Sequence, residues 1–87
     1  MKVDVYRATK FQGYHEKLYV MVPEGASPDA LPKSLKEKTG ELIKEKEVDL
    51  RPGEKRIALD VDTALKNLES HGYHEQLTRI VAPKHAV

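Results

Sequence analysis

The sequence predicts a single small α+β domain, in which a roughly four-stranded, mostly antiparallel sheet packs against two or three helices. Three observations predict this class. Apolar residues alternate at a period of two near the start of the chain, a 3.6-residue period follows near its end, and glycines and prolines separate the segments. The 87 residues suffice for one domain. We expect the order strand, strand, helix, strand, helix, strand.

The first two elements are expected to form a β-hairpin. Residues 2–8 alternate Val3 and Val5 with polar neighbours, and residues 17–22 ("KLYVMV") continue the period of two. Because nearly every residue of the second stretch is apolar, it should be a central strand that is covered on much of both faces. The polar loop between the two strands contains Gly13, at a turn position that favours positive φ.

A short helix and a third strand are expected next. Ser27 before Pro28 predicts an N-cap and a single turn, and Pro32 then starts a helix that ends at Gly40. Residues 42–49 ("LIKEKEVD") have apolar ends and a charged centre, which suits either a helix surface or an exposed edge strand. We favour a strand.

The second helix has the clearest signal. Residues 61–68 repeat apolar side chains at spacings of three and four, and Asp60 or Asp62 caps the start of the helix. Gly72 ends it. Residues 73–81 should then form the last strand of the sheet.

The composition excludes several classes of protein. The chain is 39% hydrophobic and 33% charged, which is typical of a soluble globular domain rather than a disordered one. No apolar run is long enough to span a bilayer, and the first residues lack the apolar core of a signal peptide. Since cysteine is absent, we expect a cytoplasmic protein without disulfides. Residues 1–81 should form the domain and residues 82–87 a loose tail.

The tetrapeptide Gly-Tyr-His-Glu occurs twice, at residues 13–16 and 72–75. The residues that flank the two copies differ, so the repeat does not indicate a duplicated half. His15, His71 and His74 are possible zinc ligands, but they lack the spacing of a ligand motif. We interpret them as exposed turn residues and expect neither a metal site nor a cofactor.

The sequence contains no catalytic motif that we recognise. It has no cysteine nucleophile, no serine within Gly-x-Ser-x-Gly, and no glycine-rich phosphate loop. Asp60 and Asp62 resemble a two-carboxylate metal motif, but capping of the following helix explains them. An enzyme is therefore not favoured, and a small hydrolase or a metal-binding protein ranks last among the possible functions.

Two binding functions stay open. We rank first a non-enzymatic interaction module with an unknown protein partner, because the charged strand 42–49 and the apolar end of the last strand suggest a sheet edge that a partner or second copy could join. The protein would be a monomer or a weak dimer through that edge. The alternative is an RNA-binding or RNA-processing-associated protein. The candidate ligand- or RNA-binding residues are Tyr6, Arg7, Lys10, Lys17, Tyr19, Tyr73 and Gln76.

The RNA hypothesis depends on the direction of two tyrosine side chains. If Tyr6 and Tyr19 share an exposed face of the sheet, they could stack on bases while the nearby cations bind phosphates. The alternative is that both rings pack under the helices. We favour packing, because the chain has few aromatic residues for its core and a net charge of only +1.

Four stretches in this order resemble the YcgL-domain family of small bacterial proteins: "VYRATK", "KLYVMV", "LPKSLKEKTG" and "NLESHGYHEQL". The matching positions are Tyr6, Arg7, Leu18, Tyr19, Val20, Leu31, Pro32, Gly40, Leu68, Gly72, Tyr73, Gln76 and Leu77. The resemblance implies an α/β fold without an established activity. Relatives are often encoded near a ribonuclease, which implies a context in RNA metabolism.

The chain also departs from the pattern of the family it resembles. It lacks the cysteine that relatives often carry in the first strand, and the charged residues 44–47 replace a proline and an apolar strand. Consecutive prolines after the last strand are absent as well. Any role of those features in relatives is in doubt for this chain.

Overall fold

The computed structural model describes residues 1–10, 16–56 and 59–79. The expectations for the turn at Gly13 and for the tail at 82–87 lie outside these residues. The elements in chain order are β1 (Lys2–Ala8), β2 (Glu16–Pro23), the 3₁₀ turn η1 (Pro28–Ala30), α1 (Lys33–Thr39), β3 (Leu42–Asp49), α2 (Val61–His71) and β4 (His74–Arg79). This order confirms the predicted α+β class.

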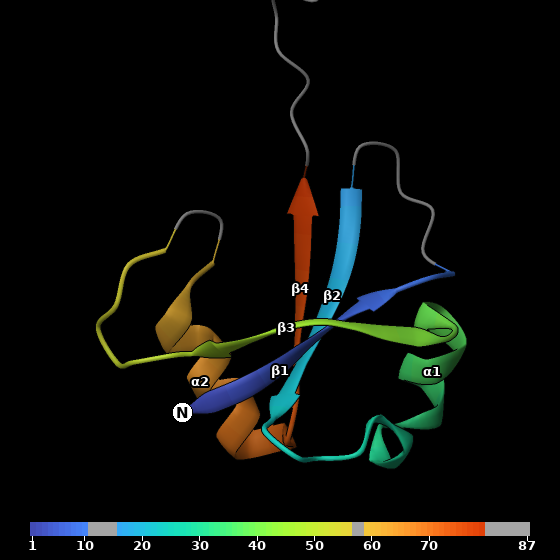
Figure 1. Ribbon diagram of the computed structural model, residues 1–87, viewed down its shortest axis with the longest axis horizontal. Helices are drawn as coiled ribbons and strands as arrows, with labels where there is room; N and C mark the ends of the chain where they lie inside the picture. The colour runs from blue at the N-terminus through green and yellow to red at the C-terminus, as the bar shows by residue number, and fades with distance from the viewer. Residues whose placement is uncertain (11–15, 57–58, 80–87) are drawn as a thin grey trace, which may run out of the picture.

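The four strands form one antiparallel sheet in the order β3-β1-β2-β4. β1 and β2 pair from Val3 opposite Pro23 to Arg7 opposite Tyr19, which confirms the predicted hairpin. In Figure 1 the β2–β4 pair runs upright while β1 and β3 cross it, so the sheet is strongly twisted. The segment whose sequence was ambiguous is β3, an outer strand of the sheet.

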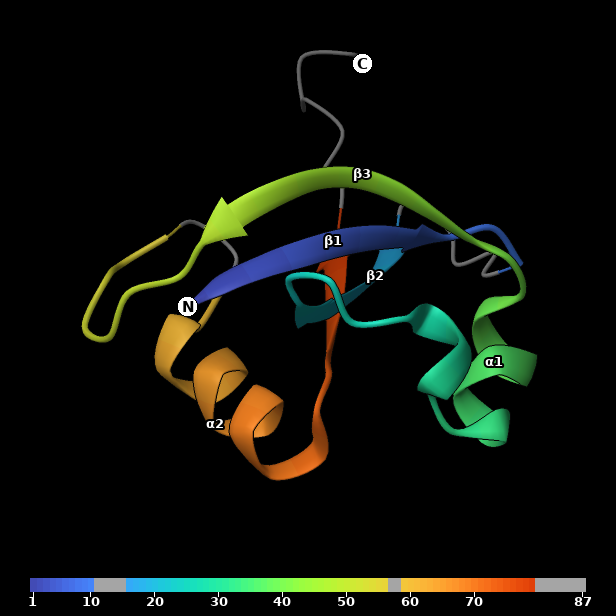
Figure 2. The same ribbon diagram turned by 60° about the horizontal axis from the view of Figure 1, so that its bottom comes forward.

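The two helices cover opposite faces of the sheet, which we name the α1 face and the α2 face after them. Residues directly opposite each other in antiparallel strands share a face. The buried core of the α2 face consists of Val3, Val5, Met21, Leu50, Val61, Ala64 and Leu68, and that of the α1 face of Val20, Val22, Leu31 and Leu35. Figure 1 shows the helices on either side of the β2–β4 pair, and Figure 2 shows β3 returning from α1 along β1.

The helix ends follow the predicted capping residues. The Ser27 hydroxyl accepts a hydrogen bond from the Asp29 N–H at 3.2 Å and so caps η1. Of the two candidate aspartates before α2, Asp60 is the cap, since its Oδ1 accepts from the Thr63 N–H at 3.1 Å. Gly72 ends α2 in the left-handed conformation, with φ 81°.

Alanine in place of Gly40 should cost more stability than alanine in place of Gly72, although both glycines have positive φ (68° and 81°). A Cβ at Gly72 meets nothing within 4 Å, so only the backbone conformation is strained, at a cost of about 1 kcal/mol. A Cβ at Gly40 would lie 2.6 Å from the Cβ of Lys10, and this clash adds to the backbone strain at φ 68° and ψ −148°, which is outside the left-handed helical region. Urea denaturation of both variants measures the difference, and equal losses would contradict this packing.

Asp60 should stabilise the protein in a pH-dependent way. The Thr63 backbone N–H lowers the pKa of Asp60 below its ordinary value of 3.8. Stabilisation by the carboxylate is therefore present above pH 3.8 and is lost as the pH falls through the lowered pKa of the folded state. The variant Asp60→Asn keeps a capping oxygen but does not titrate. Thermal melts should show wild type to be the more stable at pH 7, with the difference shrinking as the pH falls below 3.8. A difference independent of pH would contradict the assignment.

Candidate binding groove on the α2 face

Helix α2 covers only part of its face of the sheet, and the uncovered part forms a groove of about 480 Å³. Its lining comes from all four strands and from the segment between β3 and α2. The apolar and aromatic part of the lining comprises Val5, Tyr19, Met21, Val48, Leu50 and Leu59. The groove is thus continuous with the buried core beneath α2, since Val5, Met21 and Leu50 belong to both.

The polar part of the lining comprises Glu45, Lys46, Arg56, Gln76 and Thr78. Glu45 and Lys46 are neighbours in β3, yet both reach the same groove. A shift in the pairing of β1 with β3 after Val5 explains this, because the extra residue of a β-bulge interrupts the alternation of side chains. The Oε1 atom of Glu45 lies 2.7 Å from Nε of Arg7, so this carboxylate of the lining is held in an ion pair.

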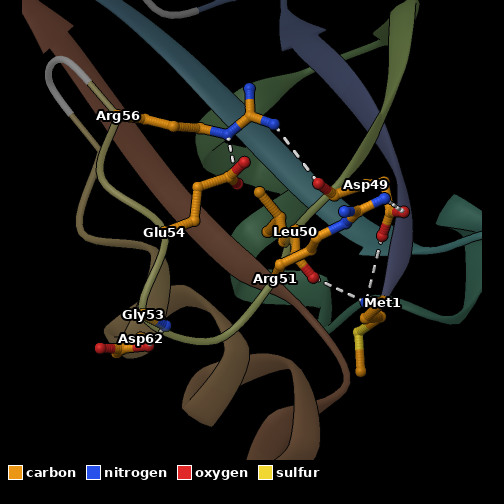
Figure 3. Close-up of polar contacts among 8 residues, drawn as sticks. All are labelled: Met1, Asp49, Leu50, Arg51, Gly53, Glu54, Arg56 and Asp62. Atoms are coloured by element: carbon orange, nitrogen blue, oxygen red, sulfur yellow. Dashed lines mark hydrogen bonds and ion pairs between the residues drawn. The ribbon is translucent and has the colours of Figure 1, made fainter.

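The groove wall between β3 and α2 is held by polar contacts of side chains to one another and to the backbone (Figure 3). Arg56 donates from Nε to Glu54 at 2.8 Å and from Nη2 to the carbonyl of Asp49 at 3.3 Å. Asp62 accepts a hydrogen bond from the Gly53 N–H at 2.9 Å. These contacts join the turn at Gly53 to both the end of β3 and the first turn of α2.

A buried histidine connects α2 to the groove. His74 is only 8% exposed, so its interpretation as an exposed turn residue is wrong. Its Nδ1 lies 2.9 Å from the Asn67 amide nitrogen and its Nε2 lies 3.0 Å from Oε1 of Gln76. Because the amide nitrogen is a donor, these partners assign the proton of a neutral ring to Nε2, which donates to Gln76. His74 therefore helps to fix the side chain of Gln76 at the groove.

Four of the seven predicted site residues lie on the α2 face. Tyr19 and Gln76 line the groove and are directly opposite each other in β2 and β4. Arg7 is opposite Tyr19 on the other side, and Lys17 is opposite the groove residue Thr78. Arg7, Tyr19 and Gln76 therefore lie side by side across β1, β2 and β4. The two cations, Arg7 and Lys17, are next to Tyr19 in this arrangement.

The remaining predicted residues lie elsewhere. Tyr6 and Tyr73 pack half-buried against the core of the α1 face, and the exposed Lys10 follows β1 and donates its N–H to Thr39 of α1. The idea that Tyr6 and Tyr19 share a face is thus wrong, because the register places Arg7, not Tyr6, opposite Tyr19. Each ring packs against a different core: Tyr6 against that of the α1 face, as the alternative of packing under the helices predicted, and Tyr19 against that of the α2 face, where it also lines the open groove.

Sequence reasoning missed the contribution of β3 and the following segment to the groove. A period of two in residues 42–49 places Lys46 and Val48 on one face, but nothing in the sequence predicts that Glu45 joins them. No sequence signal indicates Arg56. Among the residues that the structure describes, no three His, Cys, Asp or Glu side chains gather as a metal site requires; His15 is outside them.

These features define a small α+β domain with a groove on the part of a twisted antiparallel sheet that its second helix leaves uncovered. The family model of the YcgL domain matches residues 3–79, and the chain therefore belongs to the YcgL domain family. Comparison with curated proteins and with solved structures gave no match. Within the described part of the chain, neither helix has the length and apolar character needed to cross a membrane.

Replacing His74 by alanine should destabilise the protein by about 2 kcal/mol, because the substitution leaves the amides of Asn67 and Gln76 without their shared partner and opens a space under α2. His71, in the last turn of α2, is exposed and provides the matched control. The variant His71→Ala should change stability by about 0.5 kcal/mol or less. Chemical denaturation of the two variants tests this ranking, and a reversed order would refute the role assigned to His74.

Proposed function

We propose that this YcgL-domain protein is a non-enzymatic binding module and that the groove on the α2 face is its binding site. The observation that carries this proposal is the lining of the groove, in which six apolar or aromatic residues face five polar ones. Ligand sites are typically concave and mostly apolar, with a few polar groups that fix orientation, and have volumes of roughly 300–1,000 Å³. The groove, at about 480 Å³, is within this range.

The polar groups of the groove favour binding over catalysis. Glu45 is the one carboxylate among the lining residues, and Arg7 already holds it in an ion pair at 2.7 Å. A general base must instead be able to reach and accept a proton from its substrate. Gln76, which His74 helps to fix, and Thr78 offer neutral hydrogen-bonding groups. Such a site recognises a partner through shape, apolar contact and a few directed hydrogen bonds.

Single-stranded RNA is a second candidate ligand, because Tyr19 lies between two cations on one face. Arg7 is directly opposite Tyr19, and Lys17 precedes it by two residues in β2, which places all three on the α2 face. An aromatic ring flanked by cations is a common means of stacking a base and binding the adjacent phosphates. The neutralisation of Arg7 by Glu45 weakens this candidate relative to the first. A cytoplasmic location is part of either proposal.

Amide NMR titrations of the labelled protein test the site and separate the two candidates. A set of small aromatic and aliphatic fragments should shift the signals of Val48, Tyr19 and Gln76. Single-stranded RNA of about eight nucleotides should shift those of Arg7 and Lys17, and the shifts should weaken from low to physiological salt.

Two matched variants complete the experiment. Tyr19→Leu should weaken binding of the effective probe by roughly tenfold, the usual cost of losing an aromatic contact. Tyr6→Leu, the same change at a half-buried tyrosine of the α1 face, should leave binding intact. Shifts centred on the α1 face, or no shifts with any probe, would refute the groove as the binding site. Shifts with RNA alone would favour the second candidate.

A further inference from the structure

The two outer strands of the sheet differ in how well they resist pairing with another chain. β3 carries two lysines and the bulge, which are features that protect an exposed sheet edge. Lys44 is also engaged within its own chain, since its Nζ lies 3.0 Å from Glu47 and 3.5 Å from the buried Asp4. β4 contains neither lysine nor proline, pairs with β2 through six successive positions, and exposes 47% of Leu77.

We propose that two copies of this chain associate through their β4 strands, antiparallel to each other, about a two-fold axis at Leu77. The backbone donors and acceptors of an edge strand point outward at every second residue. When two identical edges pair, the outward-pointing residues of one strand must face the outward-pointing residues of the other. The two-fold axis must therefore pass through a residue, because an axis between two residues would set an outward-pointing residue opposite an inward-pointing one. The possible axes within the centre of β4 are thus Gln76, Leu77 and Thr78.

The charges of β4 select Leu77 among these axes. An axis at Leu77 places the exposed Leu77 side chains of the two copies opposite each other. It also places Glu75 of each copy opposite the arginine at position 79 of the other copy. Opposite charges and apolar side chains at facing positions stabilise a pair of strands. An axis at Gln76 would instead put Glu75 opposite Leu77, and an axis at Thr78 would put Leu77 opposite Arg79.

This dimer would have one continuous eight-stranded sheet and both grooves on the same side of it. The axis brings Gln76 of one copy opposite Thr78 of the other, and both residues line the groove. The two grooves would accordingly meet across the junction of the β4 strands. The proposed dimer does not depend on which ligand the groove binds, because it follows from the sheet edge alone.

Sedimentation velocity of the full chain, from about 10 µM to about 1 mM, tests the proposal, since a short edge forms only a small and weak interface. The mean mass of the wild type should rise with concentration. Leu77→Lys places two like charges at the axis and should weaken association by about tenfold or more. Ile43→Lys, at the similarly exposed apolar residue of β3 (42%), is the matched control and should leave association unchanged.

A charge reversal tests the antiparallel register. Glu75→Arg should weaken the dimer, and adding Arg79→Glu should restore it, although both variants equally lose the contact of Glu75 with Lys38. Circular dichroism melts confirm that each variant is folded. A wild type that stays monomeric over the whole range, a larger effect of Ile43→Lys than of Leu77→Lys, or a double reversal that fails to restore association would overturn the proposal.

Discussion

The register of the β1–β2 pair is the constraint on which the rest of this structure depends. With Tyr6 opposite Val20 and Arg7 opposite Tyr19, the alternate residues of the two central strands divide between the α1 face and the α2 face. A shift by one residue would move every side chain of one strand to the other face. Since apolar residues from both faces of these strands are buried, such a shift would disrupt both cores at once.

The bulge in β3 gives the groove its polar character. In a regular strand, Glu45 and Lys46 would point to opposite faces. The bulge lets both reach the groove, and Arg7 holds Glu45 there in an ion pair. Bulges redirect side chains and often occur near functional sites. Glu45 and Lys46, the two charged residues at the bulge, therefore both line the candidate binding site.

The two faces of the sheet differ in what they can do. The α1 face packs Leu31 and Leu35, just before and within α1, against Val20 and Val22, with Tyr6 and Tyr73 at the margin of that core. On the other face, α2 covers the part that contains Val3 and leaves the part around Tyr19 open. The hydrogen bonds of His74 cross from α2 to Gln76 at the boundary between covered and open parts. One face thus mainly stabilises the fold, while the other also presents the candidate binding groove.

The sequence by itself determined the order of the elements, the caps at Ser27 and Asp60 and the end of α2 at Gly72, because these features depend on residues close together in the chain. It also identified Tyr19 and Gln76 as candidate site residues. Only the tertiary structure decided that they are opposite each other, that Tyr6 faces away from them, and that Arg56 completes the groove. The physical reason is that strand register, a bulge and loop packing depend on contacts between residues far apart in the sequence.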